Sequence, residues 1–133
     1  MSENEQMDTT NILIVDDEED IDILTKQRFR KEIQSGECQF FFARNGYEAL
    51  SCIEQGTNID ILVTDVNMPQ MSGFELLQKI KEKYPGIKTV IISAYSDAQS
   101  LQLAEKGGAS AFISKPLDFK DLQATLKKLG KNP

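Results

Sequence analysis

Short hydrophobic runs recur along the chain, separated by longer segments in which polar residues dominate. The runs are rich in β-branched and aromatic side chains, and they do not alternate with polar positions. Strands of a parallel sheet show this pattern when helices cover both faces, because every side chain of the strand is then buried. The sequence predicts five such strands, around residues 12–15, 40–42, 61–63, 90–92 and 111–113.

The segments between these runs carry apolar residues at helical spacing. The last segment is the clearest, because Phe119, Leu122, Leu126 and Leu129 follow the three-then-four spacing of one helix face. We expect a helix in each of the four earlier segments, which show shorter versions of the same spacing: Ile21, Leu24 and Phe29; Ala49, Leu50 and Ile53; Phe74, Leu77 and Ile80; and Leu101 with Ala104.

Strands and helices therefore alternate through five βα units. Turn-forming pairs lie beside the element boundaries, namely Asn45-Gly46, Gln55-Gly56, Pro85-Gly86 and Gly107-Gly108. Connections of this length force parallel strands and right-handed crossovers. The pattern predicts an α/β fold, an open five-stranded parallel sheet with five helices on both faces. We expect residues 11–129 to form this one domain, after a flexible leader at 1–10 and before a tail at 130–133.

Composition narrows the possible functions. The length of 133 residues suits a single domain. The net charge of −6, without a cluster of Lys or Arg, argues against direct binding of nucleic acid. No apolar run approaches the ~20 residues that cross a bilayer, and the N-terminal residues are polar, so we expect no membrane contact and a cytoplasmic location. Cys38 and Cys52 are too far apart for a redox or metal pair.

Chemically active side chains follow the ends of the predicted strands. The first strand ends in Asp16-Asp17, the third in Asp65, the fourth in Ser93 and the fifth in Lys115-Pro116. Ligands bind at the carboxyl ends of the strands in open parallel sheets. We therefore expect three acids, a hydroxyl and an ammonium group to converge on one edge of the sheet.

The acids need a positive partner. If the first and third strands are neighbours, Asp17 and Asp65 lie within ~5 Å, where two like charges repel by about 3 kcal/mol at an effective dielectric near 20. Lys115 supplies one positive charge, and three carboxylates call for more. Mg²⁺ fits, because it takes one or two carboxylates and shares a substrate phosphate. The absence of His and of paired Cys disfavours Zn²⁺.

With a cation and an ammonium beside it, Asp65 becomes a plausible nucleophile toward a phosphoryl group. Each motif also has a plainer interpretation when taken alone. Asp16 followed by Glu19 resembles a helix capping box, and Asp65 before a proline resembles a turn former. The joint placement of the five residues at strand ends favours the chemical interpretation, since independent turns have no reason to converge there.

These motifs resemble the receiver domain of bacterial two-component response regulators, chemotaxis regulators among them. The resemblance rests on runs that occur in the family's order and spacing over residues 11–129: Ile14-Val15-Asp16-Asp17, Val63-Thr64-Asp65-Val66-Asn67-Met68-Pro69 with Ser72-Gly73, Ile92-Ser93-Ala94, and Lys115-Pro116. It implies a flavodoxin-like strand order of 2-1-3-4-5. It also implies a phosphoprotein that forms an aspartyl phosphate on Asp65 in a magnesium-dependent reaction.

Further roles follow from the same resemblance. Asp17, Asp65 and the Asn67 carbonyl would ligate Mg²⁺, and Asp16 would hold it through water. Lys115 would contact the phosphoryl oxygens, and the Lys115-Pro116 bond would be cis. Ser93 and Phe112 match the switch positions, and Asn67 and Tyr95 the positions that tune dephosphorylation. The implied partners are a sensor histidine kinase or phosphotransfer protein, and a downstream protein bound by the fourth helix, fifth strand and fifth helix.

Two other functional classes share this fold. A small magnesium-dependent phosphatase or phosphotransferase with an aspartyl nucleophile needs a second Asp two residues later as general acid, and that position is Asn67. A flavodoxin-like electron carrier needs a phosphate-binding loop after the first strand, where Asp16-Asp17 would repel a flavin phosphate. We therefore expect a phosphoacceptor signalling domain, not an enzyme, with only self-phosphotransfer and autodephosphorylation activity.

Overall fold

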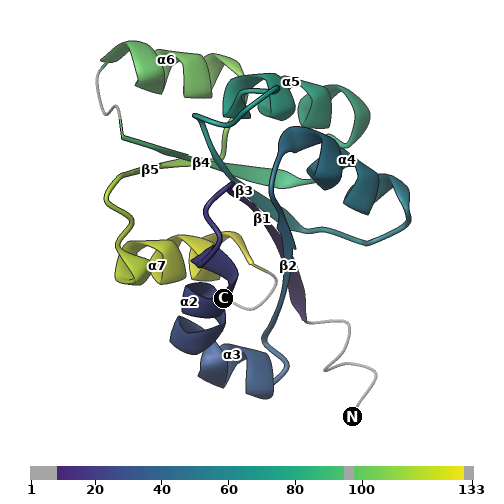
Figure 1. Cartoon of the computed structure of the whole chain (residues 1–133), viewed down its shortest axis with the longest axis vertical. Helices are drawn as coiled ribbons and strands as arrows, with labels where there is room; N and C mark the ends of the chain where they lie inside the picture. Colours follow the sequence, from purple (N-terminus) through teal and green to yellow (C-terminus); the bar gives the residue numbers. More distant parts are fainter. Residues whose placement is uncertain (1–8, 95–97, 131–133) are drawn as a thin grey trace.

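The computed structural model describes residues 9–94 and 98–130, which contain one five-stranded sheet (Figure 1). All strand pairs are parallel, and the spatial order β2-β1-β3-β4-β5 confirms the predicted topology. Each predicted run lies within a strand, and every strand extends further by one to three residues. The strands are β1 Thr10–Val15, β2 Cys38–Ala43, β3 Ile61–Asp65, β4 Lys88–Ser93 and β5 Ala111–Ser114.

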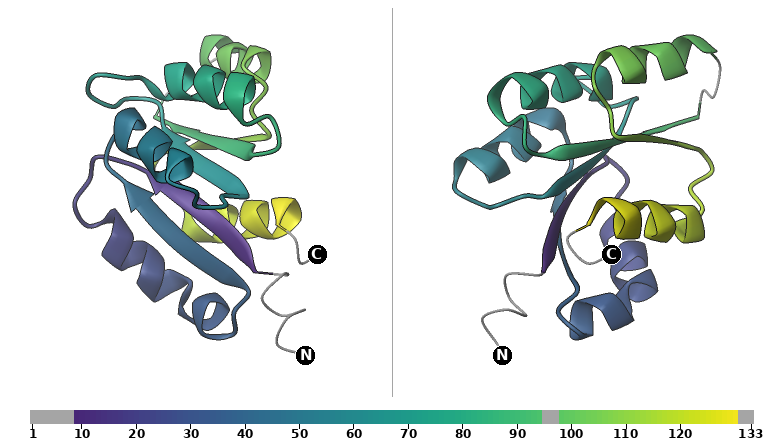
Figure 2. Two further views of the ribbon diagram at one scale, coloured as in Figure 1. Left: turned by 90° about the vertical axis from the view of Figure 1, so that its right-hand side faces the viewer. Right: turned by 180° about the vertical axis from the view of Figure 1, so that it is seen from behind.

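Helices cover both faces of this sheet, as the βα pattern predicts (Figures 1 and 2). On one face lie α2 Ile21–Arg28, α3 Arg30–Gln34 and α7 Phe119–Leu129. On the other lie α4 Gly46–Glu54, α5 Gly73–Lys83 and α6 Ala98–Lys106. Within the described residues, no helix combines the length and the apolar character that crossing a membrane requires.

The prediction of five helices is wrong by one, because the first helical segment is divided at Phe29. This residue has φ −105° and ψ 22°, outside the helical region. Hydrogen bonds continue across it, from the Phe29 N–H to the Thr25 carbonyl and from the Ile33 N–H to the Phe29 carbonyl, each at 2.9 Å. The Phe29 ring is buried and lies 5.0 Å from the Phe40 ring. The helix therefore breaks where the Phe29 ring packs against the sheet, and the spacing of apolar residues does not predict this break.

Alternate residues of the central strands supply the cores of the two faces. Leu13, Val15 and Leu62 pack toward α4 and α5, whereas Ile12, Ile14 and Val63 pack toward α2 and α7. The central strands are thus buried on both faces, as the continuous apolar runs predict. A rigid sheet of this kind fixes where its carboxyl edge presents side chains.

Candidate functional site

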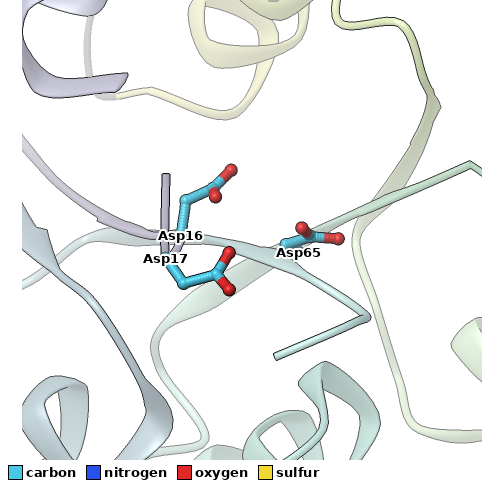
Figure 3. Close-up of side chains that lie close together, drawn as sticks. All are labelled: Asp16, Asp17 and Asp65. Atoms are coloured by element: carbon cyan, nitrogen blue, oxygen red, sulfur yellow. The ribbon is translucent and has the colours of Figure 1, made fainter. Parts of the chain in front are cut away.

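Three acidic side chains meet at the carboxyl edge of the sheet. Asp16 and Asp17 directly follow β1, and Asp65 ends β3 (Figure 3). One carboxylate oxygen from each lies within 4.8 Å of the others. This confirms the close approach expected for Asp17 and Asp65. Asp65 is only 4% exposed and Asp16 only 9%, whereas Asp17 is exposed to solvent.

Strand register produces this arrangement. Val15 pairs with Thr64 in the β1–β3 ladder, so the next residues, Asp16 and Asp65, lie side by side just beyond it. The Asp16 N–H donates to the Ala43 carbonyl at 3.0 Å, which extends β1 pairing by one residue. The Asp16 carboxylate accepts the Glu18 N–H at 3.0 Å. The backbone thereby holds Asp16 in place whatever binds to its carboxylate.

Lys115 brings a positive charge to the cluster. The Lys115 Nζ lies 2.7 Å from Asp65 Oδ2, and the backbone N–H of Lys115 donates to the Ser93 carbonyl at 2.8 Å. The following bond to Pro116 is cis, as the resemblance implies. Burial alone would lower the pKa of Lys115, but its hydrogen bond to Asp65 and the nearby carboxylate charges more than offset that effect and raise the pKa. Lys115 is therefore a stable cation facing Asp65.

The cluster still carries excess negative charge. Burial raises the pKa of Asp16, aided by the charges of Asp65 and Glu18 and despite the hydrogen bond from the Glu18 N–H, so a further cation beside it would stabilise its ionised form. Three carboxylates converge within 4.8 Å, and the chain contains no His. Such an oxygen-only donor set fits a hard divalent ion such as Mg²⁺ and does not fit Zn²⁺.

The loop after Asp65 folds back onto the site. The Asn67 N–H donates to Asp65 Oδ1 at 3.3 Å, while the Asn67 side chain is exposed. Gln70 has φ 73°, an uncommon conformation for a residue with a side chain. The loop closes where the Gly73 N–H donates to the Val66 carbonyl at 2.9 Å, and the Ser72 hydroxyl caps α5 by accepting the Glu75 N–H.

Gly73 lies at the site, although the sequence analysis includes it only in the Ser72-Gly73 motif and assigns it no role of its own. A Cβ atom added there would lie 2.3 Å from the Asp65 carbonyl oxygen and 2.9 Å from Val66 Cα. The α5 backbone therefore lies in close contact with the backbone of Asp65. A glycine shortly after an acidic strand end is the available sequence signal, and it does not identify the contact.

The predicted switch residues occupy different surroundings. Ser93 is fully buried at the end of β4, one residue beyond the pairing of Asp65 with Ile92. Phe112 is half-buried on β5 and packs against the cluster that contains Val66, Leu77 and Ile91. Tyr95 lies outside the described residues.

Comparison with known proteins identifies the fold and the family. The family model described as response regulator receiver domain matches residues 12–127. Sporulation initiation phosphotransferase F of Bacillus subtilis is 33% identical over 117 residues, which cover 88% of this chain and 90% of that protein. The transcriptional regulatory protein ZraR of Escherichia coli is 35% identical over 91% of this chain, and the match spans only 26% of ZraR.

Solved structures agree. A CheY-like response regulator receiver domain protein of Methanospirillum hungatei superposes with a TM-score of 0.80 at 32% identity, covering 91% of this chain and 94% of that one. The response regulator TrrA of Thermotoga maritima, in complex with Mg²⁺ and BeF, gives a TM-score of 0.73 at 33% identity over 90% and 98% of the two chains. The phosphatase alternative is thereby not favoured, and the chain belongs to the response regulator receiver domain family.

Proposed function

We propose that Asp65 accepts a phosphoryl group in a magnesium-dependent reaction and that the protein signals through the resulting change of surface. The observation that carries the proposal is the meeting of Asp16, Asp17 and Asp65 within 4.8 Å, with the Lys115 ammonium 2.7 Å from Asp65, in a receiver-domain fold. A nucleophile, a cation site and a fixed ammonium are the parts that phosphoryl transfer needs.

In this proposal an Asp65 carboxylate oxygen attacks phosphorus in line with the leaving oxygen or nitrogen, whose bond to phosphorus breaks as the aspartyl phosphate forms. Lys115 balances charge on the phosphoryl oxygens. Asp17, Asp65 and the Asn67 carbonyl would hold Mg²⁺ directly, with Asp16 acting through water. The bound ion would neutralise the carboxylates and the phosphoryl oxygens, and the burial and like charges around Asp16 support that need.

The donor would be a sensor histidine kinase or a phosphotransfer protein, in the cytoplasm. The signal would pass to a protein partner that binds the surface formed by α6, β5 and α7. These are the fourth helix, fifth strand and fifth helix of the sequence prediction. On α6, Leu101 is 39% and Leu103 45% exposed, so this helix offers apolar side chains to a partner. The proposed activity ends at self-phosphotransfer and autodephosphorylation, and it includes neither direct binding of nucleic acid nor contact with a membrane.

The first test is phosphorylation by a small acyl phosphate. The wild-type chain should gain one phosphoryl group per molecule with Mg²⁺ and none in excess chelator, because the uncompensated carboxylates repel the incoming anion. Intact-mass spectrometry measures the gain. Equal modification with chelator would remove the metal from the mechanism.

The second test separates the two neighbouring acids. Asp17→Ala should weaken Mg²⁺ binding by about a hundredfold or more, and Asp16→Ala by about tenfold, because a residue acting through water contributes less than a direct ligand. Asp20→Ala is the matched control, since Asp20 is an exposed acid of the same loop outside the cluster. Calorimetric titration gives the three affinities, and equal losses for Asp16 and Asp17 would refute the division of roles.

The third test concerns the switch. Ser93→Ala should still be phosphorylated, yet the amide resonances of α6, β5 and α7 should shift much less on phosphorylation, because the hydroxyl that would bond to a phosphoryl oxygen is gone. Couplings of this kind are about 1–3 kcal/mol. Ser114→Ala is the control, since Ser114 pairs with Ser93 in the β4–β5 ladder and is exposed. Undiminished shifts in Ser93→Ala would mean that the signal leaves by another route.

A further inference from the structure

A groove of about 290 Å³ lies between the helices α2 and α3 and the edge strand β2. Its apolar part consists of Ile33 and Phe40, which are half-buried. Its polar lining residues are all exposed, and they are Lys26, Arg30, Gln34 and Gln39. The groove therefore carries positive charge, although the chain as a whole has a net charge of −6.

The two basic side chains of the groove lack acidic partners. Neither Lys26 nor Arg30 forms an ion pair with a carboxylate of residues 9–94 or 98–130. The Lys26 ammonium lies 5.7 Å from the centre of the Phe42 ring, a contact that favours its position beside β2. Two uncompensated cations next to an apolar surface fit an acidic segment that also carries an apolar side chain.

The chain itself contains such a segment. Residues 1–8, which we call the N-terminal segment, lie outside the described residues and contain Glu3, Glu5 and Asp8 but no Lys or Arg. In an extended chain alternate side chains share one side, so Glu3, Glu5 and Met7 would face together and Asp8 would face away. Two extended residues advance by ~6.6 Å. The two acids would thus have nearly the spacing of the two basic residues, which lie four helical residues or ~6 Å apart.

The N-terminal segment is joined to the fold beside the groove. The Thr9 hydroxyl donates to the Gly36 carbonyl at 2.6 Å, in the loop between α3 and β2. β1 and β2 start at the same end of the sheet (Figure 1). Six extended residues from Thr9 back to Glu3 span up to ~20 Å, whereas the largely helical stretch from Gly36 back to Lys26 spans ~15 Å. The N-terminal segment is therefore long enough to reach both basic residues.

We propose that the N-terminal segment binds in this groove of its own chain, with Glu3 beside Lys26 and Glu5 beside Arg30. Met7 packs against the apolar part of the groove. The contact closes the groove to other acidic polypeptides. It goes beyond phosphoryl acceptance and does not depend on it, because no residue of the groove belongs to the acidic cluster at the carboxyl edge.

Contacts between Met7 and Phe40 test the binding directly. The full chain, labelled at methionine methyl groups and phenylalanine rings, should give nuclear Overhauser contacts between these two side chains at low salt. Their absence would leave the groove open to a separate acidic partner and would overturn the proposal. A mixture of chains labelled only at methionine with chains labelled only at phenylalanine should give no such contact. A contact in the mixture would place the N-terminal segment of a second copy in the groove and would overturn binding within one chain.

Charge removal in the N-terminal segment tests the proposed pairing. Glu5→Gln should lower the ratio of bound to unbound segment by about twofold to fivefold, the worth of one exposed ion pair, and the Met7 methyl shift reports this ratio. Asp8→Asn is the matched control, because it removes the same charge from the opposite side of the same extended segment, and it should leave the ratio nearly unchanged. Equal losses in Glu5→Gln and Asp8→Asn would overturn the pairing of Glu5 with Arg30.

The groove side of the same pair completes the test. Arg30→Gln should lower the ratio as much as Glu5→Gln does. Lys31→Gln is the control, since Lys31 is the next exposed basic residue of α3 and does not line the groove. The double variant Glu5→Gln with Arg30→Gln should lose no more than either single variant, because the pair is already broken. Losses that add in the double variant would mean that the two residues act separately and would overturn the pairing.

Discussion

Asp65→Asn should gain no detectable phosphoryl group under conditions in which the wild-type chain is fully modified. The amide keeps the size of the carboxylate and an oxygen that can accept a hydrogen bond from Lys115, but it lacks the negative charge that makes Asp65 a nucleophile. Intact-mass spectrometry with an acyl phosphate and Mg²⁺ measures the loss, and circular dichroism checks that the variant is folded.

The neighbouring acids make this a demanding test. Asp16 and Asp17 present carboxylate oxygens within 4.8 Å of Asp65, so either would be modified if proximity alone selected the acceptor. The matched control is Asp60→Asn, because Asp60 lies at the opposite end of β3 and keeps its bond from the Asn11 N–H through the amide oxygen. Asp60→Asn should be phosphorylated like wild type. Full modification of Asp65→Asn would assign the phosphoacceptor to another carboxylate.

The placement of the acidic cluster could be predicted from the sequence, because residues at the ends of neighbouring parallel strands lie close together in the fold. The first charged residue after a hydrophobic run marks the end of a buried strand. The carboxyl ends of parallel strands lie at the same edge of the sheet. Asp16, Asp65 and Lys115 each follow directly from that rule. The strand order is a separate matter, since it came from the family resemblance, and the pairing of β1 with β3 is what brings Asp16 beside Asp65.

Features that depend on contacts between distant segments of the chain could not be predicted from the sequence pattern. The periodicity that predicted the first helix includes Leu24, which is 45% exposed, and does not reveal the break at Phe29. The Thr25 hydroxyl has no hydrogen-bond partner in the part of the chain that the structure describes, and the sequence does not predict this, because a threonine in a helix normally bonds to its own backbone. The spacing of apolar residues along the chain indicates which segments form helices or strands. A helix break or an unpaired hydroxyl depends instead on the residues that pack against the helix from other segments.

The contact of Gly73 with Asp65 belongs to this second group and leads to the other large effect. Gly73→Ala should destabilise the protein by about 2–3 kcal/mol, because the new methyl group would overlap the Asp65 carbonyl and backbone cannot move aside as a side chain can. At this chain length the loss corresponds to a Tm lower by about 10 °C. Phosphorylation should also slow, since relieving the overlap displaces the nucleophile. Thermal unfolding and single-donor rate measurements test both effects.

Two other glycines separate steric overlap from the general effect of replacing glycine. Gly86→Ala should change stability by less than about 0.5 kcal/mol, because nothing lies within 4 Å of the added Cβ and the position is exposed. Gly46→Ala should cost less than Gly73→Ala, since its new methyl meets the Met71 side chain, which can rotate. If Gly73→Ala and Gly86→Ala unfold at the same temperature, the α5 backbone does not hold Asp65, and the loop from Val66 to Ser72 must position the phosphoacceptor without it.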